Sequence, residues 1–342
     1  MFKSILIVII CLAAILFASC SDKLNNKAEN ETGSADSDSI GVEETVINTE
    51  NTQNTSEENM KMIAIIADTE FKNGFICGGA THADGIVGEL KSPVSSGSPS
   101  WKIAQWACKN DISKGEHTEN ADGYSYSTES QKVAVSWKQD APLLTLELKA
   151  SKEYDAPRIS GQAWPHLLIE QTDLSDRCPK LDKIENLNLA FEIRVLYCDS
   201  HMDNPDPGLH AAQITLFFTV QSSDTNDMYW FGVPVFDNRN KLVPEYMAED
   251  GGKEDASHKF IYTAAQKSFT KISAWDFTKL TYNTDLLPYI KRGLDRAYKE
   301  GYLNSRNLAD YTLTTCNLGY EMPGTYDSAF ELYRFTLDAV LK

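Results

Sequence analysis

The clearest pattern in the sequence is a strict alternation of apolar and polar side chains after residue 211. Its apolar members are Ala212, Ile214, Leu216, Phe218 and Val220. Only a β-strand places every second side chain on one face, so this segment is predicted to be a strand. A polar segment (222–227) and a segment rich in aromatic and β-branched residues (228–239) follow. Together they predict a β-hairpin in an antiparallel sheet.

The same alternation, with turn residues between the segments, recurs along most of the chain. Residues 133–137 and 144–148 flank a turn and predict a second hairpin. Further strands are expected at 62–66, 74–80, 101–106, 165–171, 187–197, 259–263, 311–318 and 329–337. Roughly a dozen strands exceed what an immunoglobulin-type domain uses. The pattern therefore predicts an all-β fold in which two antiparallel sheets stack as a sandwich.

One segment near the C-terminus follows a helical period instead. Leu286, Leu287, Ile290, Leu294, Ala297 and Tyr298 recur at the spacing of one helix face. Asp285 is a suitable N-cap, Pro288 is tolerated in the first turn, and Gly301 is a natural residue after the last turn. We predict a helix at about 285–300 that covers an edge or an end of the sandwich.

The N-terminus has the features of an export signal. Lys3 precedes a short apolar run, and the small residues Ala18 and Ser19 come just before Cys20. The sequence Leu16 to Cys20 resembles the lipobox of bacterial lipoproteins, in which the cysteine is lipidated, although Phe17 departs from the usual Leu. The alternative is an ordinary signal peptide with a chance cysteine. We expect residues 1–19 to be cleaved and the mature chain to be lipid-anchored at Cys20 in the bacterial cell envelope, outside the cytoplasm.

Residues 20–59 are polar and contain no aromatic side chain. They bury too little apolar area to offset the entropy of ordering, so they are expected to form a flexible tether with a root-mean-square span of roughly 35 Å. Residues 60–342 contain no second linker and are predicted to form a single domain. Membrane contact is expected through the anchor only.

The charge of the chain excludes one class of partner. The formal net charge is −17, and 3 of the 32 basic and 10 of the 49 acidic side chains lie before residue 60, so the remainder carries about −10. Nucleic acid is therefore not an expected partner, and we expect a monomer.

Five cysteines remain once Cys11 and Cys20 are set aside. They are Cys77, Cys108, Cys178, Cys198 and Cys316. Export permits disulfides, and Cys77 with Cys108 or Cys178 with Cys198 are the nearest pairs in sequence, but buried free thiols fit equally well. No Cys and His spacing suggests zinc, and no cofactor is predicted. Asp199, Asp203 and Asp206 form an acidic loop that is suited to calcium or simply to solvent.

A secreted domain with many alternating strands, aromatic central strands and one peripheral helix resembles the concanavalin-like jelly rolls of lectins and bacterial glycan-active enzymes. The resemblance covers residues 71–342 and is one of pattern. It implies a jelly-roll sandwich and a glycan or oligosaccharide as partner. The E-x-D-x-x-E strand of laminarinase-like hydrolases is absent, as are the signatures of alginate lyases. No catalytic residue is therefore carried over.

Alternation itself identifies candidate site residues, because it turns certain polar and aromatic side chains away from the core. Trp230 is expected to lie outward beside Gly232, Pro234 and Phe236 and to offer a stacking surface for a sugar ring, unless it packs in the core. Pro234 indicates an edge or a bulge. The other expected carbohydrate-binding residues are Gln213, Asp237, Arg239, Glu192 and Arg194. Asp237 and its neighbours are also ordinary turn residues.

Three residues are candidates for catalysis. His166 and Glu170 lie four apart on one strand face, which suits a general acid and base pair, and Glu321 is a further carboxylate. Neighbouring strands satisfy such groups just as readily. The sequence thus leaves three functions open: a carbohydrate-binding module, a glycoside hydrolase or polysaccharide lyase, and a structural or protein-binding envelope protein. Two carboxylates at hydrolase spacing would distinguish the second from the first.

Overall fold

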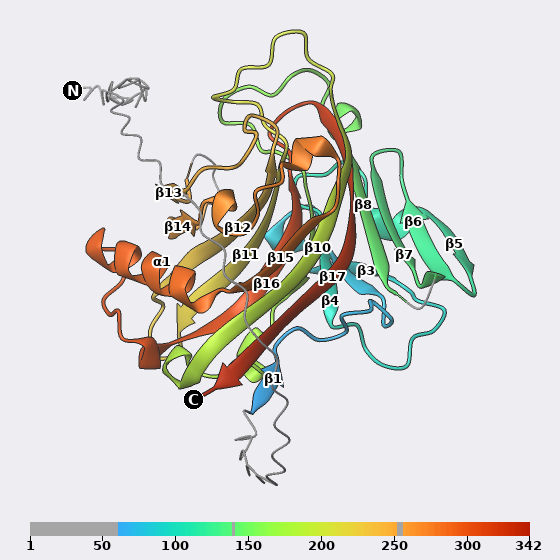
Figure 1. The fold of residues 1–342 in the computed structure, drawn as a ribbon. Helices are drawn as coiled ribbons and strands as arrows, with labels where there is room; N and C mark the ends of the chain where they lie inside the picture. Colours follow the sequence, from blue (N-terminus) through green and yellow to red (C-terminus); the bar gives the residue numbers. More distant parts are fainter. Residues whose placement is uncertain (1–60, 139–140, 252–255) are drawn as a thin grey trace, which may run out of the picture. The chain divides into compact units, whose positions relative to one another are not determined.

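The computed structural model describes residues 61–138, 141–251 and 256–342. The predicted signal peptide, Cys20 and the tether lie outside these residues. The described part folds into two stacked sheets and one α-helix, so the predicted two-sheet jelly-roll β-sandwich is confirmed (Figure 1). None of the helices in these residues is long and apolar enough to cross a membrane.

The first sheet, called sheet A, has eight strands. Its order is β15, β10, β17, β8, β7, β6 and β5, and β1 pairs with β17 outside that path. All of its pairs are antiparallel. The strands are β1 (Met62–Ala64), β5 (Glu116–Asn120), β6 (Gly123–Ser127), β7 (Gln131–Ser136), β8 (Leu143–Lys149), β10 (Ile184–Ser200), β15 (Leu280–Asp285) and β17 (Tyr326–Leu341).

The second sheet, called sheet B, has nine strands in the order β13, β14, β12, β11, β16, β9, β4, β2 and β3. The expectation of purely antiparallel pairing is wrong at two places, because β2 pairs with β4 and β12 pairs with β14 in parallel. The strands are β2 (Phe75–Gly78), β3 (Ile86–Leu90), β4 (Trp101–Ala104), β9 (His166–Gln171), β11 (Gln213–Ser222), β12 (Met228–Asp237), β13 (Tyr246–Glu249), β14 (Phe260–Thr263) and β16 (Tyr311–Glu321).

The core lies between the two sheets. The alternating apolar side chains Ile214, Leu216 and Phe218 of β11 are fully buried there, as are Leu144 and Leu146 of β8. Both predicted hairpins, β11 with β12 and β7 with β8, are present. Because each strand gives one face to this core, the outer faces of the two sheets are left for other roles.

Helix α1 (Leu287–Lys299) confirms the predicted helix. The N-cap is Leu286 and not the predicted Asp285, but Asp285 Oδ1 accepts a hydrogen bond from the backbone N–H of Leu287 (3.0 Å). Gly301 adopts a positive φ of 82° just after the last turn. The apolar side of α1 packs on the inner side of sheet B. At Gly293 an added Cβ would lie 2.7 Å from Tyr229 and 2.8 Å from Tyr262, so the absence of a side chain permits this close approach.

One residue of the predicted helix face is placed differently. Tyr298 is 41% exposed, and the Arg306 guanidinium lies over its ring at 5.5 Å from the centroid. Short 3₁₀ turns connect other elements, at 82–84, 112–114, 150–152, 174–176, 181–183, 266–268, 274–276 and 308–310.

All five cysteines in the described residues are free thiols. Four of them are buried and Cys198 is half-buried. Burial raises the pKa of Cys77 and of Cys198 to about 12, so both stay protonated at neutral pH. The structure therefore holds buried thiols and neither of the two disulfides considered from sequence.

Candidate functional site

The outer face of sheet B brings together most of the predicted site residues in two rows that run across the strands. The first, called the central row, passes through Lys102, Glu170, Asn317 and Phe217 on four neighbouring strands. It continues to both sheet edges through Ile76 and Glu89 on one side and Gly232, Thr263 and Tyr246 on the other.

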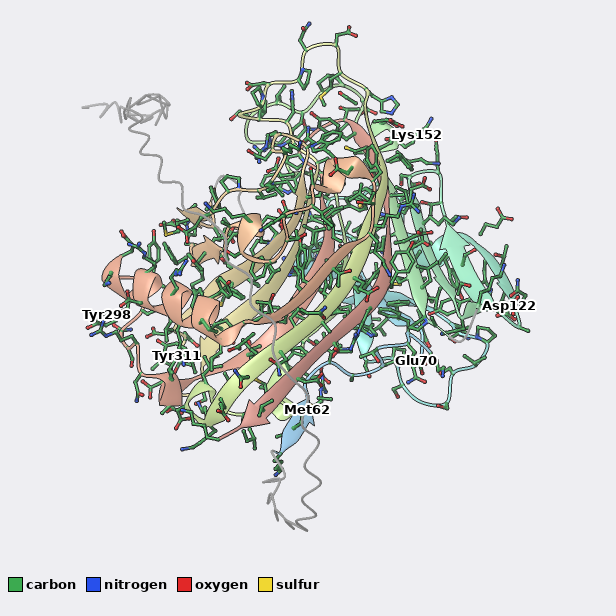
Figure 2. All side chains as sticks on the ribbon, in the orientation of Figure 1. Met62, Glu70, Asp122, Lys152, Tyr298 and Tyr311 are labelled. Carbon is green, nitrogen blue, oxygen red and sulfur yellow. The ribbon has the colours of Figure 1, made fainter. Side chains whose placement is uncertain are left out.

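The second row, called the end row, lies four residue positions further along the strands. It passes through His166, Glu321, Gln213 and Asp237. The positions between the two rows are held by Leu168, Gly319, Thr215 and Pro234, which carry small or apolar side chains or none. The outer face of sheet B is thus polar in two bands that are separated by a less polar one. Figure 2 shows the side chains of the described residues on the ribbon.

Glu170 is the most buried acid of the central row. The side chain is 7% exposed, and its Oε2 lies 3.5 Å from Nζ of Lys102. Burial raises the pKa of Glu170 above its usual value, and the nearby ammonium of Lys102 only partly opposes that shift. The central row therefore holds a carboxyl group that gains a proton more readily than an ordinary glutamate.

The end row begins with a carboxylate surrounded by aromatic rings. Glu321 Oε2 lies 3.7 Å from Nε2 of His166 and accepts a hydrogen bond from the indole Nε1 of Trp164 (3.4 Å). Trp164 stacks beside His166 with ring centroids 5.9 Å apart, and Trp106 meets the other side of His166 edge-on at 5.4 Å. His82 continues the run of rings at 4.2 Å from Trp106.

The other half of the end row is a closed hydrogen-bond network. Arg239 donates from Nε and Nη2 to the two carboxylate oxygens of Asp237 (2.8 and 2.6 Å), and Gln213 Nε2 donates to Oδ2 (3.0 Å). Burial opposes the ionisation of Asp237, but the hydrogen bonds from Arg239 and Gln213 outweigh it. The pKa of Asp237 is therefore lower than usual.

Trp230 lies on the outer face of sheet B and is half-buried. Its indole Nε1 donates to Ser257 Oγ (3.2 Å), and its ring meets Phe217 edge-on at 6.4 Å. The space beside Trp230 at Gly232 is occupied, because Thr263 Oγ1 and the Phe217 ring lie 2.5 and 2.8 Å from where a Cβ would be. Trp230 is therefore partly accessible on the outer face, and Phe217 and Thr263 fill the space beside it.

The predicted outward position of Phe236 is also wrong. A register shift separates the pair Ile214 and Phe236 from the pair Thr215 and Pro234, so a β-bulge lies next to Pro234, as predicted. The extra residue returns Phe236 to the side of the core residue Ile214, and Phe236 is buried.

Glu192 and Arg194 do not belong to this site. Both lie on β10, in sheet A, where Glu192 Oε2 contacts Lys279 Nζ at 2.6 Å and Arg194 Nε donates to the Phe277 carbonyl (2.8 Å). Alternation correctly predicted that they turn outward, but it does not say from which sheet. Sequence reasoning also missed Trp106, Trp164 and Lys102 as members of the site, although aromatic residues at strand ends would have been a signal.

The predicted acid and base pair of His166 and Glu170 is not formed. Both side chains are on the outer face of sheet B, but they contact Glu321 and Lys102 respectively. Glu170 and Glu321 lie on neighbouring strands, four positions apart in register, which separates their backbones by about 13 Å along the strand direction. Each carboxylate is held within its own row.

Metal binding finds no support in the described residues, which contain no cluster of three or more His, Cys, Asp or Glu side chains suited to an ion. In the acidic loop, Asp206 Oδ1 instead accepts a hydrogen bond from the backbone N–H of Gly208 (2.8 Å). This is the ordinary hydrogen bonding of an Asp-containing turn.

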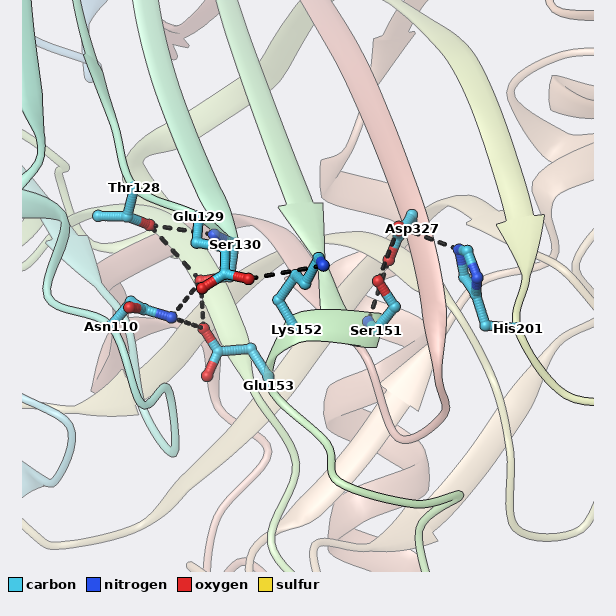
Figure 3. Close-up of polar contacts among 9 residues, drawn as sticks. All are labelled: Asn110, Thr128, Glu129, Ser130, Ser151, Lys152, Glu153, His201 and Asp327. Atoms are coloured by element: carbon cyan, nitrogen blue, oxygen red, sulfur yellow. Dashed lines mark hydrogen bonds and ion pairs between the residues drawn. The ribbon is translucent and has the colours of Figure 1, made fainter.

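A cavity of about 170 Å³ lies outside the two rows, next to the segments that follow β2 and β4. Its lining residues are Gly79, Ala80, Asp84, Val87, Gln105, Cys108, Lys109, Asn110 and Asp111. Next to it, the buried Glu153 carboxylate accepts hydrogen bonds from Asn110 and from Ser130 (Figure 3). This network connects the loop after β4 to the turn between β6 and β7.

Figure 3 also shows Ser151, Asp327 and His201, the residue types of a catalytic triad. Ser151 Oγ donates to Asp327 Oδ2 (2.9 Å), and His201 Nε2 lies 3.0 Å from that same oxygen. The carboxylate therefore stands between the hydroxyl and the imidazole. Since a nucleophilic serine needs the imidazole as its direct base, this order does not activate Ser151.

No protein-family model and no curated protein matches the sequence. Among solved structures, the chain is similar to a family 12 xyloglucanase from Bacillus licheniformis at 8% identity, over 69% of this chain and 99% of that one, with a TM-score of 0.39. The chain is also similar to a family 11 xylanase from Neocallimastix patriciarum at 8% identity, over 70% of this chain and 100% of that one, with a TM-score of 0.35. A third similar structure is the xyloglucanase domain of NopAA from Sinorhizobium fredii in complex with cellobiose. The identity is 11%, over 69% of this chain and 98% of that one, and the TM-score is 0.31. Similarity at this level carries no argument about the site of this chain.

Proposed function

We propose that this chain is a lipid-anchored, extracytoplasmic carbohydrate-binding protein that receives a glycan on the outer face of sheet B. The observation that carries the proposal is the convergence of seven predicted site residues on that one face. They are His166, Glu170, Glu321, Trp230, Gln213, Asp237 and Arg239. Residues distant in sequence thereby form one surface of carboxylate, amide, guanidinium and aromatic groups.

The chemistry of this surface suits a sugar chain. Sugars present apolar ring faces and hydroxyl groups, and they need aromatic platforms together with polar partners. Half-buried aromatic residues flank the polar bands, with Trp230 near the central row and Trp106 and Trp164 at the end row. The side chains of Glu321 and Lys102 keep 34% and 29% of their surface exposed and are within reach of hydroxyl groups.

We place binding before hydrolysis because each candidate carboxylate already has a charged or ionisable partner in its own row, Lys102 for Glu170 and His166 for Glu321. The second candidate function, a glycoside hydrolase or polysaccharide lyase, rests on the raised pKa of Glu170, which suits a general acid. Reducing-end and ultraviolet lyase assays against each glycan that binds would distinguish the two. Product formation that Glu170→Gln abolishes would replace the binding proposal with the enzymatic one.

The lipid anchor is the part of the proposal that concerns location. The small residues before Cys20 and the polar segment after it support acylation there. Expressed in a bacterium, the mature chain is expected to begin at an acylated Cys20 and to fractionate with membranes, whereas Cys20→Ala leaves it without the lipid. Intact-mass analysis checks this, and an unmodified N-terminus cleaved elsewhere would exclude the anchor.

The binding test uses Trp230→Ala with Trp275→Ala as its matched control. Trp275 is 37% exposed and lies in the 3₁₀ turn 274–276 against Phe277 and the core-facing Phe236, so it belongs to neither row. A polysaccharide array first identifies a ligand, and calorimetry then measures its affinity. Trp230→Ala is expected to weaken binding by about 1 kcal/mol or more, because a stacking contact is lost, while Trp275→Ala leaves it unchanged.

Stability is measured on the same two variants. Trp230 contacts Phe217 and Ser257 but is only half-buried, so its loss is expected to lower the melting temperature by no more than a few degrees. Unchanged affinity in Trp230→Ala, or a collapse of its stability, would remove this face as the glycan site. A structural or protein-binding envelope protein would then be the remaining candidate.

A further inference from the structure

The outward side of α1 is basic in an otherwise acidic protein. Lys291, Arg292, Arg296 and Lys299 are exposed along it, and Arg306 follows in the next loop. Along the helix the acids are Asp295, which pairs with Lys299 and Arg306 (2.6 and 3.1 Å), and Glu300, and Glu245 lies 3.8 Å from Arg292. In the loop after the helix, Tyr302, Asn304 and Ser305 donate hydrogen bonds to Glu249, Asp227 and Asp310, so that loop is not basic. We call the exposed side of α1 over residues 291–299 the basic face; its four basic side chains and Asp295 give it a net charge of +3 in a chain of −17.

Two of its charges have no ion-pair partner within the described part of the chain. Lys291 and Arg296 are both exposed and stand outside every ion pair formed there, whereas the pairs of Lys299 and Arg306 share the single carboxylate of Asp295. The basic face thus has cationic groups to offer a partner. An acidic surface is its electrostatic complement.

The orientation of the basic face follows from what α1 buries. Its apolar side lies on Tyr229 and Tyr262, which point inward from β12 and β14. The basic face therefore points away from sheet B and is opposed to the outer face that carries the two polar rows. A partner on one of these surfaces leaves the other open.

The start of α1 lies close to where the described chain begins. The backbone N–H of Leu286, just before α1, donates to Leu187 of β10 (2.8 Å), β10 pairs with β17, and β17 pairs with β1 through Met62 and Val340. Three strand spacings, about 14 Å, therefore separate the start of α1 from β1. In Figure 1, α1 lies on the left at about mid-height and β1 lies at the lower end of the view. About 40 residues, from 20 to 60, precede this point.

We propose that the basic face of α1 docks on the anionic lipid headgroups of the membrane, so that the outer face of sheet B is turned away from the bilayer. Each basic side chain near an anionic surface adds a favourable electrostatic contribution that salt weakens. A tether of about 40 residues holds the basic face at high effective concentration near that surface, so weak charge contacts suffice. The choice of a membrane as the partner rests on the lipid anchor in the proposed function. The attraction between the basic face and an anionic surface does not depend on that anchor.

The test measures binding to vesicles without the acyl chain. Full-length protein carrying Cys20→Ala is sedimented with vesicles of phosphatidylcholine alone and of phosphatidylcholine mixed with phosphatidylglycerol, at low and high NaCl. Because the leader is the same in every sample, its apolar insertion contributes equally. The anionic vesicles are expected to bind more protein, and high salt is expected to remove the difference.

The deciding variant combines Lys291→Glu and Arg296→Glu. Its matched control combines Lys91→Glu and Lys138→Glu, two exposed lysines that follow β3 and β7, with the same change of net charge. The helix variant is expected to lose about tenfold or more of the partitioning onto anionic vesicles, and the control is expected to keep it. Melting curves confirm that both variants are folded.

Three outcomes would overturn the proposal. The first is equal partitioning of the helix variant and its control, and the second is equal binding of the protein to both kinds of vesicle. The third is a dimer in size-exclusion chromatography that only the helix variant disrupts. That result would assign the basic face to a second copy of the chain. Glycan binding by the same helix variant is measured in parallel. If neither the helix variant nor the parent protein binds a glycan, the proposed function is contradicted. The vesicle result is not affected by that outcome.

Discussion

The central row and the end row lie on one face of one sheet, yet their buried carboxylates behave in opposite ways. The pKa of Glu170 is raised and that of Asp237 is lowered. The difference comes from the partners, because Glu170 faces one ammonium at 3.5 Å. Asp237 instead accepts two hydrogen bonds from the Arg239 guanidinium, one from the Arg239 backbone N–H and one from the side-chain amide of Gln213. Burial alone therefore does not decide the charge of a group on this face.

The contrast assigns the two rows different roles. In the end row the half that contains Asp237 is a satisfied network that stabilises the fold. In the central row burial raises the pKa of the Glu170 carboxyl group, and groups with shifted pKa values occur often at functional sites. This agrees with a ligand that approaches the central row and is flanked by the aromatic residues at either side.

The largest expected change in stability comes from a substitution in the end row. Asp237→Asn leaves the Arg239 guanidinium without its carboxylate and is expected to lower the free energy of unfolding by about 2 to 4 kcal/mol. Chemical denaturation measures it. Asp203→Asn, in an exposed loop, is the control and should change stability by less than about 0.5 kcal/mol. Equal effects would show that the network does not stabilise the fold.

The pH dependence of stability separates the two rows by sign. The folded pKa of Glu170 is above its unfolded value, so the stability it contributes is present below about pH 4 and lost as pH rises through the folded pKa. Glu170→Gln does not ionise, so melting temperatures should show the variant gaining on the parent between pH 4 and pH 7. If the difference in melting temperature between the variant and the parent were the same at pH 4 and pH 7, it would contradict the raised pKa of Glu170.

Asp237 should show the opposite slope. Its folded pKa is below its unfolded value, so its contribution is present above about pH 4 and lost as pH falls through the folded pKa. The destabilisation caused by Asp237→Asn is therefore expected to shrink in melting curves taken at progressively lower pH. A penalty that stayed constant down to pH 2 would show that it comes from packing and not from charge.

The smallest expected effect sharpens the boundary of the site. Replacing both Glu192 and Arg194 by Ala removes two residues that the sequence suggested for carbohydrate binding but that lie on sheet A. Calorimetry with the ligand found for the parent protein is expected to show no change in affinity. A loss comparable to that of Trp230→Ala would move the site to the other sheet.

Much of the fold could be predicted because it rests on local patterns. Alternation located the hairpin of β11 and β12, and the spacing with its caps located α1. Strand β5, with the sequence Glu116 to Asn120, was missed because every residue in it is polar and exposed. The parallel pairs of β2 with β4 and of β12 with β14 depend on long connections that no local pattern records.

Many individual residues of the site could be predicted from the sequence, but their arrangement in two rows across the strands could not. Alternation gives the side of a strand and not the neighbour, so Gln213 and Glu321 were both named without any sign that they are paired in register. Phe236 was misplaced because one extra residue in a bulge reverses the alternation. Trp106 and Trp164 follow or precede strands, where no period applies, and only the packing around His166 reveals them.

Strand β1 determines how the sandwich would respond to mechanical pulling from its N-terminal end. This strand is three residues long and is attached through its pairing with β17 at Val340, Ala339 and Asp338. Tension would therefore peel away β1 first, while the next attachments, from the Ile65 N–H to Leu337 (2.8 Å) and from Arg177 to the Ile65 carbonyl (2.7 Å), would resist. The first strand would act as a short extensible segment, and both sheets would keep their remaining pairs under load.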